Sequence, residues 1–141
     1  MRIEALRVDT YGPCRHTRDH WYEAPTHTSA RSRRATEDRM ITLSIRYTID
    51  AGKRADFETY ARSVAAPIER CGGKVVGYFA PTKFAGPTNI ALSLIDFPSL
   101  AAYEHYREAL AKDPEHIEVA RRAEQSGVVL VEDRSFVQRV S

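Results

Sequence analysis

Four tyrosines and one arginine are the residues of this sequence whose chemistry best suits a small-molecule site. They are Tyr47, Tyr60, Tyr78, Tyr103 and Arg107, and all lie beyond residue 40. A tyrosine offers an apolar ring and a hydroxyl group that needs a hydrogen-bond partner when it is buried. Several tyrosines around one cavity could therefore orient a small hydrophobic or aromatic ligand. Packing in the core and in an interface is the alternative role for them.

Arg107 is expected on the buried face of a helix. Residues spaced three and four apart share one face of a helix, and this face would consist of Leu100, Tyr103, Arg107 and Leu110. A buried guanidinium needs an acidic partner. That partner is either the carboxylate of a ligand or a protein carboxylate, for which the candidates are Glu104, Glu108 and Asp96.

The histidines and cysteines are weaker candidates for chemistry. His105 could act as a general base or a haem ligand, because the unperturbed pKa of histidine lies near physiological pH. It stands two residues from Tyr103 and from Arg107, so it is expected to face solvent, and His116 is expected to be exposed as well. Cys71 lies at a predicted helix C-terminus, where the helix dipole disfavours a thiolate. No zinc-ligand spacing, nucleophile elbow, P-loop or Rossmann pattern occurs, so neither metal nor cofactor is predicted.

The chain changes character at Met40. Residues 10–38 contain no Val, Ile, Leu, Met or Phe, and such a segment cannot bury enough apolar surface to fold. Residues 1–39 are therefore predicted to be a disordered extension, or sequence upstream of a true start at Met40. A targeting peptide is a third interpretation, although the segment has no apolar core and carries six acidic residues. Residues 40–141 are predicted to form one domain.

Bulk composition narrows the possible partners and compartments. The formal net charge of +2 is too small to support nucleic-acid binding as the main function. No apolar run reaches the length of a membrane span, so no membrane association is predicted. The two cysteines fall in separate regions, which favours a reducing, cytoplasmic location.

Alternation and helical periodicity predict the order of elements from residue 40 onward. Strands are expected at 41–48, 74–81 and 89–97, and helices at 53–71, 98–112 and 114–125, with Pro98 in the first turn of its helix. Residues 128–140 form two short strands or one interrupted strand, divided at Glu132-Asp133. The order is that of an α+β, ferredoxin-like split βαβ fold with an antiparallel sheet and its helices on one face.

The strands carry apolar residues on both faces, although helices would cover only one. Val75 and Phe79 are expected to point one way, and Val76 and Tyr78 the other. A sheet that is apolar on both sides needs a second cover. A second copy of the same sheet is the simplest one, which predicts a homodimer. A monomer whose last strand folds over the open face is the alternative.

Several short motifs, taken in order, resemble the NIPSNAP family of the dimeric α/β-barrel superfamily. They are Gly77-Tyr78-Phe79 with Pro81, Asn89-Ile90-Ala91, Phe97-Pro98-Ser99-Leu100-Ala101-Ala102-Tyr103-Glu104, Tyr106-Arg107, Asp113-Pro114-Glu115 and Arg134-Ser135-Phe136. The resemblance covers about residues 40 to 141 and does not extend to residues 1–39.

This resemblance implies a barrel of two chains with a cavity between sheet and helices in each protomer. It implies no agreed reaction, and relatives in the superfamily include cofactor-free monooxygenases and haem-degrading enzymes. We therefore expect a protein that binds or transforms a small hydrophobic or aromatic molecule in that cavity. A non-catalytic dimeric interaction or stress-related module is the alternative, and a cofactor-free monooxygenase or haem-binding protein is a further one.

Overall fold

The computed structural model describes residues 39–141, so the predictions for the N-terminal extension fall outside the described part except at Arg39. Its elements are β1 (Ile41–Ile49), the short 3-10 turn η1 (Ala51–Lys53), α2 (Arg54–Arg70), β2 (Lys74–Phe79), β3 (Ile90–Phe97), α3 (Leu100–Lys112), α4 (Pro114–Ser126) and β4 (Val129–Gln138). The predicted order of elements is confirmed. The C-terminal region forms one continuous strand, β4, rather than two.

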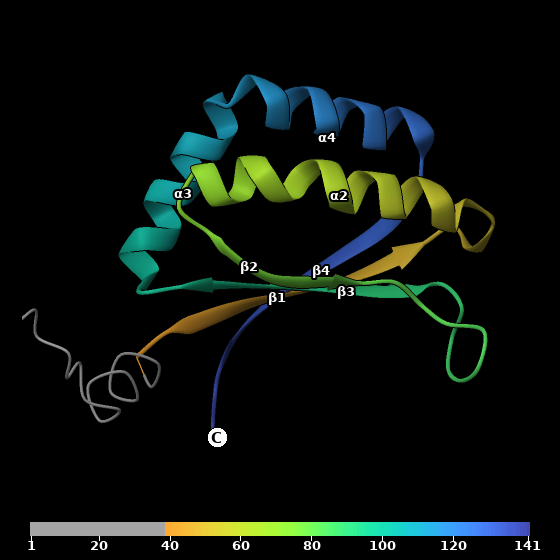
Figure 1. The fold of residues 1–141 in the computed structure, drawn as a ribbon, viewed down its shortest axis with the longest axis horizontal. Coiled ribbons are helices and arrows are strands. Elements are labelled where there is room, and N and C mark those ends of the chain that lie inside the picture. The colour runs from red at the N-terminus through yellow and green to blue at the C-terminus, as the bar shows by residue number, and fades with distance from the viewer. Residues whose placement is uncertain (1–38) are drawn as a thin grey trace, which may run out of the picture.

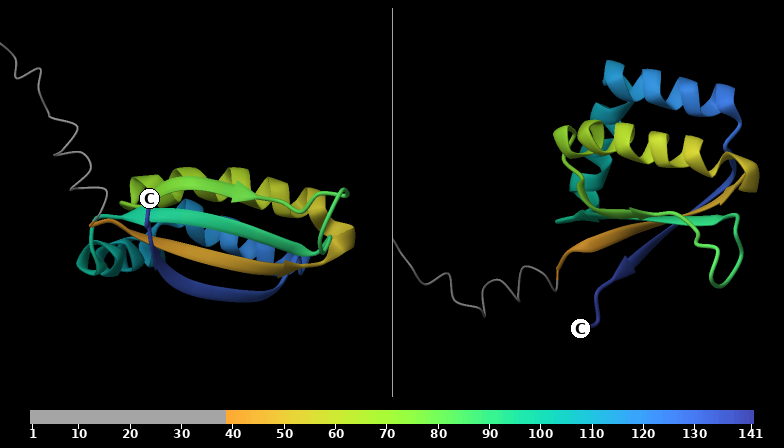
Figure 2. Two further views of the ribbon diagram at one scale, coloured as in Figure 1. Left: turned by 90° about the horizontal axis from the view of Figure 1, so that it is seen from below. Right: turned by 45° about the vertical axis from the view of Figure 1, so that its right-hand side comes forward.

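The four strands form one antiparallel sheet in the order β2-β3-β1-β4. All three α-helices lie on the same side of it, and the opposite face is uncovered (Figure 1). Seen from below, the strands lie in front of the helices with nothing across them (Figure 2). This arrangement confirms the predicted α+β, ferredoxin-like fold. Within residues 39–141, no helix is both long enough and apolar enough to cross a membrane.

Local hydrogen bonds set the helix boundaries around the core. The hydroxyl of Ser99 accepts from the Ala102 backbone N–H at 3.1 Å and caps α3. Pro98 therefore precedes the cap, and the expectation that it occupies the first helical turn is wrong. Asp113 caps α4 in the same way, with Pro114 in the first turn. Gly127 ends α4 at a φ of 63°, in the left-handed region that glycine adopts without strain.

The core lies between the sheet and the helices. Alternate residues of β1 point into it, and these are Leu43, Ile45, Tyr47 and Ile49, all buried. Between them, Arg46 points to the open face and pairs with Asp133 of the neighbouring strand at 3.6 Å.

A β-bulge in β2 changes which of its side chains face the core. The pairing with β3 shifts between Val75 and Gly77, because the bulged strand places one additional residue against its partner. Val75 and Tyr78 consequently face the helices, whereas Val76 and Phe79 face the open side, where each is 51% exposed. The expectation of strict alternation, with Val75 beside Phe79, is wrong for this reason.

The buried face of α3 is rotated from the expected one. Tyr106 and Leu110 are buried, Tyr103 is half-buried, and Leu100 is 58% exposed. Arg107 is exposed, so its predicted place in the buried stripe is wrong. Spacings of three and four fit the set Tyr103, Tyr106 and Leu110 as well as the expected set. The large ring of Tyr106 fills the core, and Arg107 moves to the side.

Candidate functional site

A cavity of about 340 Å³ lies between the sheet and the helices. Its apolar wall comes from strands and helices alike and consists of Leu43, Ile45, Val64, Ile68, Ile95 and Leu110. Further side chains from α2, α3, α4 and β4 complete the wall, so the cavity forms only when the helices pack on the sheet. Its volume lies at the lower end of the range of small-molecule sites, which suits a small ligand.

Three of the predicted tyrosines share this cavity. Tyr47 of β1, Tyr60 of α2 and Tyr78 of β2 all line it. Their ring centroids are 6.3 to 6.4 Å apart, a separation at which aromatic rings attract one another. The hydroxyl groups of Tyr47 and Ser93, both buried, lie 3.3 Å apart and share a hydrogen bond. The structure therefore groups aromatic residues from three separate elements on one wall.

Burial keeps these phenols protonated. Loss of solvent raises the pKa of Tyr47, Tyr60 and Tyr78 well above the ordinary range. Burial also raises the pKa of Tyr106 to about 12, although Arg107 and Arg134 act in the opposite direction. At neutral pH the wall therefore presents hydroxyl groups that can donate hydrogen bonds, and no phenolate nucleophile.

Arg107 lines the same cavity from α3. Among the described residues it makes no hydrogen bond or ion pair, so the predicted pairing with a protein carboxylate is not present. Asp96, one of the expected partners, instead accepts from the Thr42 hydroxyl at 2.6 Å. The guanidinium is therefore an unpaired cation beside an apolar cavity.

Tyr103 is the predicted site residue that the structure does not place on the cavity wall. Its ring packs edge-on against Phe97 at 5.3 Å and against Phe136 at 4.9 Å. Tyr106 joins the same aromatic group, with its centroid 6.0 Å from that of Tyr103. This second cluster packs the N-terminal half of α3 against β3 and β4.

Five further polar residues line the cavity and are not among the five predicted site residues. They are Tyr106, His116, Glu124, Glu132 and Arg134. Helical spacing from Tyr103 could have found Tyr106. Alternation back from Phe136 could have found Arg134 and Glu132, had Glu132-Asp133 not been interpreted as a break in the strand. Within β4, Arg134 donates to Glu132 at 3.0 Å, so these two charges neutralise each other locally.

His116 is half-buried on the cavity wall, although exposure was expected. Burial lowers the pKa of its imidazole, and the positive charges of Arg107 and Arg134 lower it further, against the opposing effect of Asp113. A hydrogen bond to the Leu110 backbone also opposes this lowering. The lowered pKa favours a neutral imidazole, in which one ring nitrogen carries no proton. In contrast, His105 is exposed and does not line the cavity, as expected.

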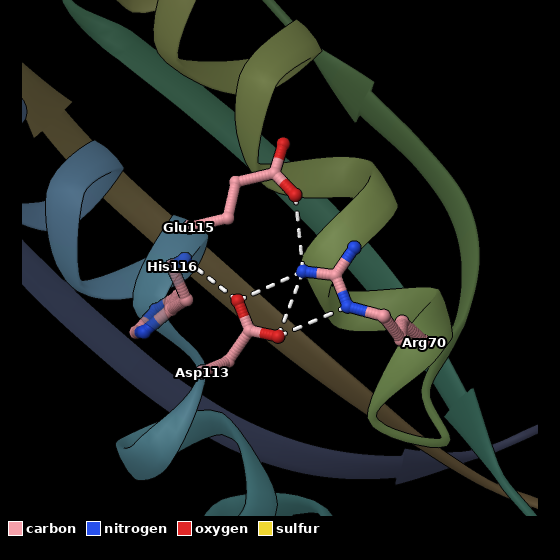
Figure 3. A network of polar contacts seen from close by, with 4 residues as sticks. All are labelled: Arg70, Asp113, Glu115 and His116. Carbon is pink, nitrogen blue, oxygen red and sulfur yellow. Dashed lines mark hydrogen bonds and ion pairs between the residues drawn. The ribbon is translucent and has the colours of Figure 1, made fainter.

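An ion-pair network positions the start of α4, and with it His116. Arg70, at the end of α2, donates from Nε and Nη2 to Asp113 at 2.7 to 3.0 Å and from Nη2 to Glu115 at 3.0 Å. Asp113 also accepts from the backbone N–H of His116 at 2.9 Å. Figure 3 shows the His116 ring directed away from this pair. The His116 backbone N–H and Arg70 together lower the pKa of Asp113, so the network stays charged.

The lining of the cavity has the chemistry that suits an organic molecule. Within residues 39–141, no group of three or more His, Cys, Asp or Glu side chains is arranged to hold a metal ion. What the wall offers is apolar surface, phenolic hydroxyl groups, one unpaired guanidinium and one neutral imidazole. This combination can enclose a ring, orient an oxygen atom and accept a proton.

The sequence matches the NIPSNAP family over residues 43–141. The chain belongs to this family. The resemblance noted from the short motifs is thereby confirmed. The NIPSNAP match begins three residues after Met40 and does not include the N-terminal extension. A comparison with curated proteins finds no match.

Solved structures of NIPSNAP proteins share the fold. An uncharacterised NIPSNAP-like domain protein from Burkholderia xenovorans is 22% identical, with a TM-score of 0.64 over 74% of this chain and 88% of its own. A NIPSNAP family protein from Agrobacterium tumefaciens is 21% identical, with a TM-score of 0.64 over 73% of this chain and 88% of its own. At these identities the likeness concerns the fold.

A cofactor-independent oxygenase from Streptomyces nogalater has the same architecture. It is 18% identical, with a TM-score of 0.53 over 73% of this chain and 95% of its own. The fold of this NIPSNAP domain is therefore also one on which an oxygenase has been built.

Proposed function

We propose that this NIPSNAP protein binds a small hydrophobic or aromatic molecule in the cavity between its sheet and its helices. The observation that carries the proposal is the grouping of Tyr47, Tyr60, Tyr78 and Arg107 around about 340 Å³ of space. These residues come from four elements, and together they leave a partly open space that a small molecule can enter.

The tyrosines suit an aromatic ligand better than a purely aliphatic one. Their rings contact each other edge-on or stacked, and a further ring can join such an arrangement with a gain beyond apolar burial. Their protonated hydroxyl groups can donate to a carbonyl or hydroxyl oxygen of the ligand. The site therefore favours a ring system that carries an oxygen substituent.

Native mass spectrometry of freshly purified protein tests this proposal directly, because it reports any ligand that copurifies. Binding of 2-naphthamide, a neutral two-ring compound, tests the cavity itself by calorimetry. Ala120, on the cavity wall, offers a variant that fills the space, and Ala111 on the exposed side of α3 offers the control. Ala120→Leu should weaken binding about tenfold, through loss of space for ring contacts, and Ala111→Leu should not. Equal binding by all three proteins would contradict the proposal.

Turnover of the bound molecule is a second candidate, and the neutral imidazole of His116 favours it. With anthrone as a test substrate, His116 would take a proton from the ring CH₂ group. The resulting carbanion would add dioxygen to give a peroxide anion, which takes the proton back from His116. The hydroperoxide then loses water to give anthraquinone, with no cofactor. We expect oxygen uptake that falls at least about tenfold in His116→Gln and is unchanged in His105→Gln, since His105 lies outside the cavity. Equal rates in both variants would exclude this role.

We further propose that a second copy of the chain covers the open face of the sheet. Val76, Phe79, Leu92, Val131 and Val137 on this face are 40 to 51% exposed. Exposed apolar side chains on this scale are a common feature of interfaces, and the same face on a second copy offers a matching apolar surface. Light scattering on the full chain should give a dimer mass at micromolar concentration.

Leu92 and Leu100 provide a matched pair for that test. Leu92 lies on the open face, opposite Arg46 and Phe79 in the two neighbouring strands, and Leu100 is exposed on α3. Leu92→Lys should yield a monomer, because a lysine there would be buried against the partner's apolar residues. Leu100→Lys should remain a dimer. A monomeric mass for the unmodified protein would overturn the proposal.

A further inference from the structure

Charged side chains lie on and near the cavity wall. Arg107 and Arg134 both lower the pKa of Tyr106 and of His116, and Asp113 opposes them at His116. The carboxylate of Glu132 raises the pKa of Tyr47 and Tyr60, and Arg134 opposes it at Tyr60. Arg107, on the wall in the middle of α3, therefore lies within electrostatic reach of Tyr106 and of His116 at the start of α4.

Only one of these cations is without a partner in the described chain. Arg134 is paired with Glu132 at 3.0 Å, whereas Arg107 makes no hydrogen bond or ion pair. Glu124, the remaining acidic residue on the wall, lies eight residues along α4 from His116, or about 12 Å at the rise of a helix. Asp113, the carboxylate that acts on His116, is itself paired with Arg70, so among residues 39–141 no carboxylate forms an ion pair with Arg107.

An unpaired guanidinium beside an apolar wall is suited to one kind of ligand group. Its planar fork of N–H donors matches the two oxygens of a carboxylate, and such a charge-assisted pair is stronger than a neutral hydrogen bond. The neutral phenol of Tyr106 lies beside it and can donate to the same group. The apolar wall and the tyrosine rings then receive the remainder of the molecule.

We propose that the ligand of this cavity is an aromatic carboxylate, with its ring against the tyrosines and its carboxylate on the guanidinium of Arg107. This inference rests on the function proposed above and narrows its ligand class. Arg107 is thereby assigned as the residue that selects acids over neutral compounds of the same shape.

Calorimetry with 2-naphthoate and with 2-naphthamide tests this assignment, because the two compounds have the same ring and differ in charge. The unmodified protein should bind naphthoate about tenfold or more tightly than naphthamide, the preference expected of one charge-assisted pair. Arg107→Gln should lose this preference, so that the ratio of its two affinities falls about tenfold. Arg62→Gln, on the exposed surface of α2 and outside the cavity, should keep it.

The outcomes separate this inference from the proposed function. If naphthamide binds and naphthoate binds no better, the cavity function stands and the acid preference is wrong. If Arg107→Gln keeps the preference, another cation is responsible and the assignment is wrong. If neither compound binds to the unmodified protein, both the inference and the proposed function fail. Thermal unfolding of each variant checks that the fold is intact.

Discussion

The two faces of the sheet are built from alternate residues of the same strands, yet they differ strongly in the exposure of their side chains. The face toward the helices buries Leu43, Ile45 and Tyr47 almost completely. The opposite face leaves Phe79 and Leu92 at 51% and 40% exposure. Both faces carry apolar side chains, so the difference lies mainly in what covers them.

That difference separates two roles within one sheet. The covered face carries a partly open cavity between the sheet and the helices. The open face carries apolar side chains and one exposed ion pair, Arg46 with Asp133. We infer that the covered face holds the ligand and that the open face holds the partner.

The largest expected effect is a loss of folding stability at high pH, caused by the buried tyrosines of the covered face. Burial raises the pKa of Tyr47, Tyr60 and Tyr78. Below about pH 10 these phenols are neutral in the folded and in the unfolded protein, so their titration does not change the free energy of unfolding. Above it the unfolded chain releases protons that the folded chain retains, so stability falls by about 1.4 kcal/mol per pH unit for each tyrosine.

Thermal unfolding followed by tyrosinate absorbance measures this effect. We expect the melting temperature to fall from about pH 10 upward, with these three tyrosines ionising only as the protein unfolds. Phe79→Ala, on the open face, should leave this alkaline transition in place. Ionisation of all three in the folded protein near pH 10 would show that the covered face is open to water.

Two phenylalanines compare the faces directly. Phe97 has no exposed surface and packs beneath α3, so Phe97→Ala should lower the free energy of unfolding by about 3–5 kcal/mol. Phe79→Ala, at a concentration where the chain is monomeric, should change it by less than about 0.5 kcal/mol. Denaturant unfolding at several protein concentrations measures both. A large loss in monomeric Phe79→Ala would mean that the open face is covered within one chain.

The buried hydroxyl groups of Tyr47 and Ser93 test whether water reaches the covered face. Tyr47→Phe removes one of the two phenols that interact with the buried Ser93 hydroxyl, the other being Tyr78, and should cost about 1 kcal/mol. Combining it with Ser93→Ala measures how strongly the two hydroxyl groups are coupled. On the open face, Thr42→Val removes the bond to Asp96, where water can take its place, so a smaller cost is expected. Equal costs would argue that water reaches both.

Arg46→Ala should have the smallest effect. Its ion pair with Asp133 is more than half exposed, so the monomer should lose less than about 0.5 kcal/mol. If the open face is a dimer interface, the dimer should lose more than the monomer. A concentration series of unfolding curves separates the two contributions. An equal loss at all concentrations would place this pair outside the interface.

Much of the fold could be predicted from local patterns. Alternation in β1 and the cap residues of α4 specified their elements directly, since each depends on neighbours close in sequence. Predictions failed where the buried face of an element differs from the one that a regular pattern gives. The bulge at Val76 in β2 and the choice of Tyr106 over Arg107 in α3 are both decided by packing against distant segments.

The candidate site shows the same division. The sequence by itself determined an antiparallel split βαβ domain, two apolar sheet faces and a supply of tyrosines, because periodicity and side-chain chemistry are local properties. Only the tertiary structure decided that Tyr47, Tyr60 and Tyr78 share one cavity while Tyr103 packs elsewhere. It also brought His116 and Arg134 to that wall and left Arg107 unpaired, since contacts between distant segments depend on how the helices dock on the sheet.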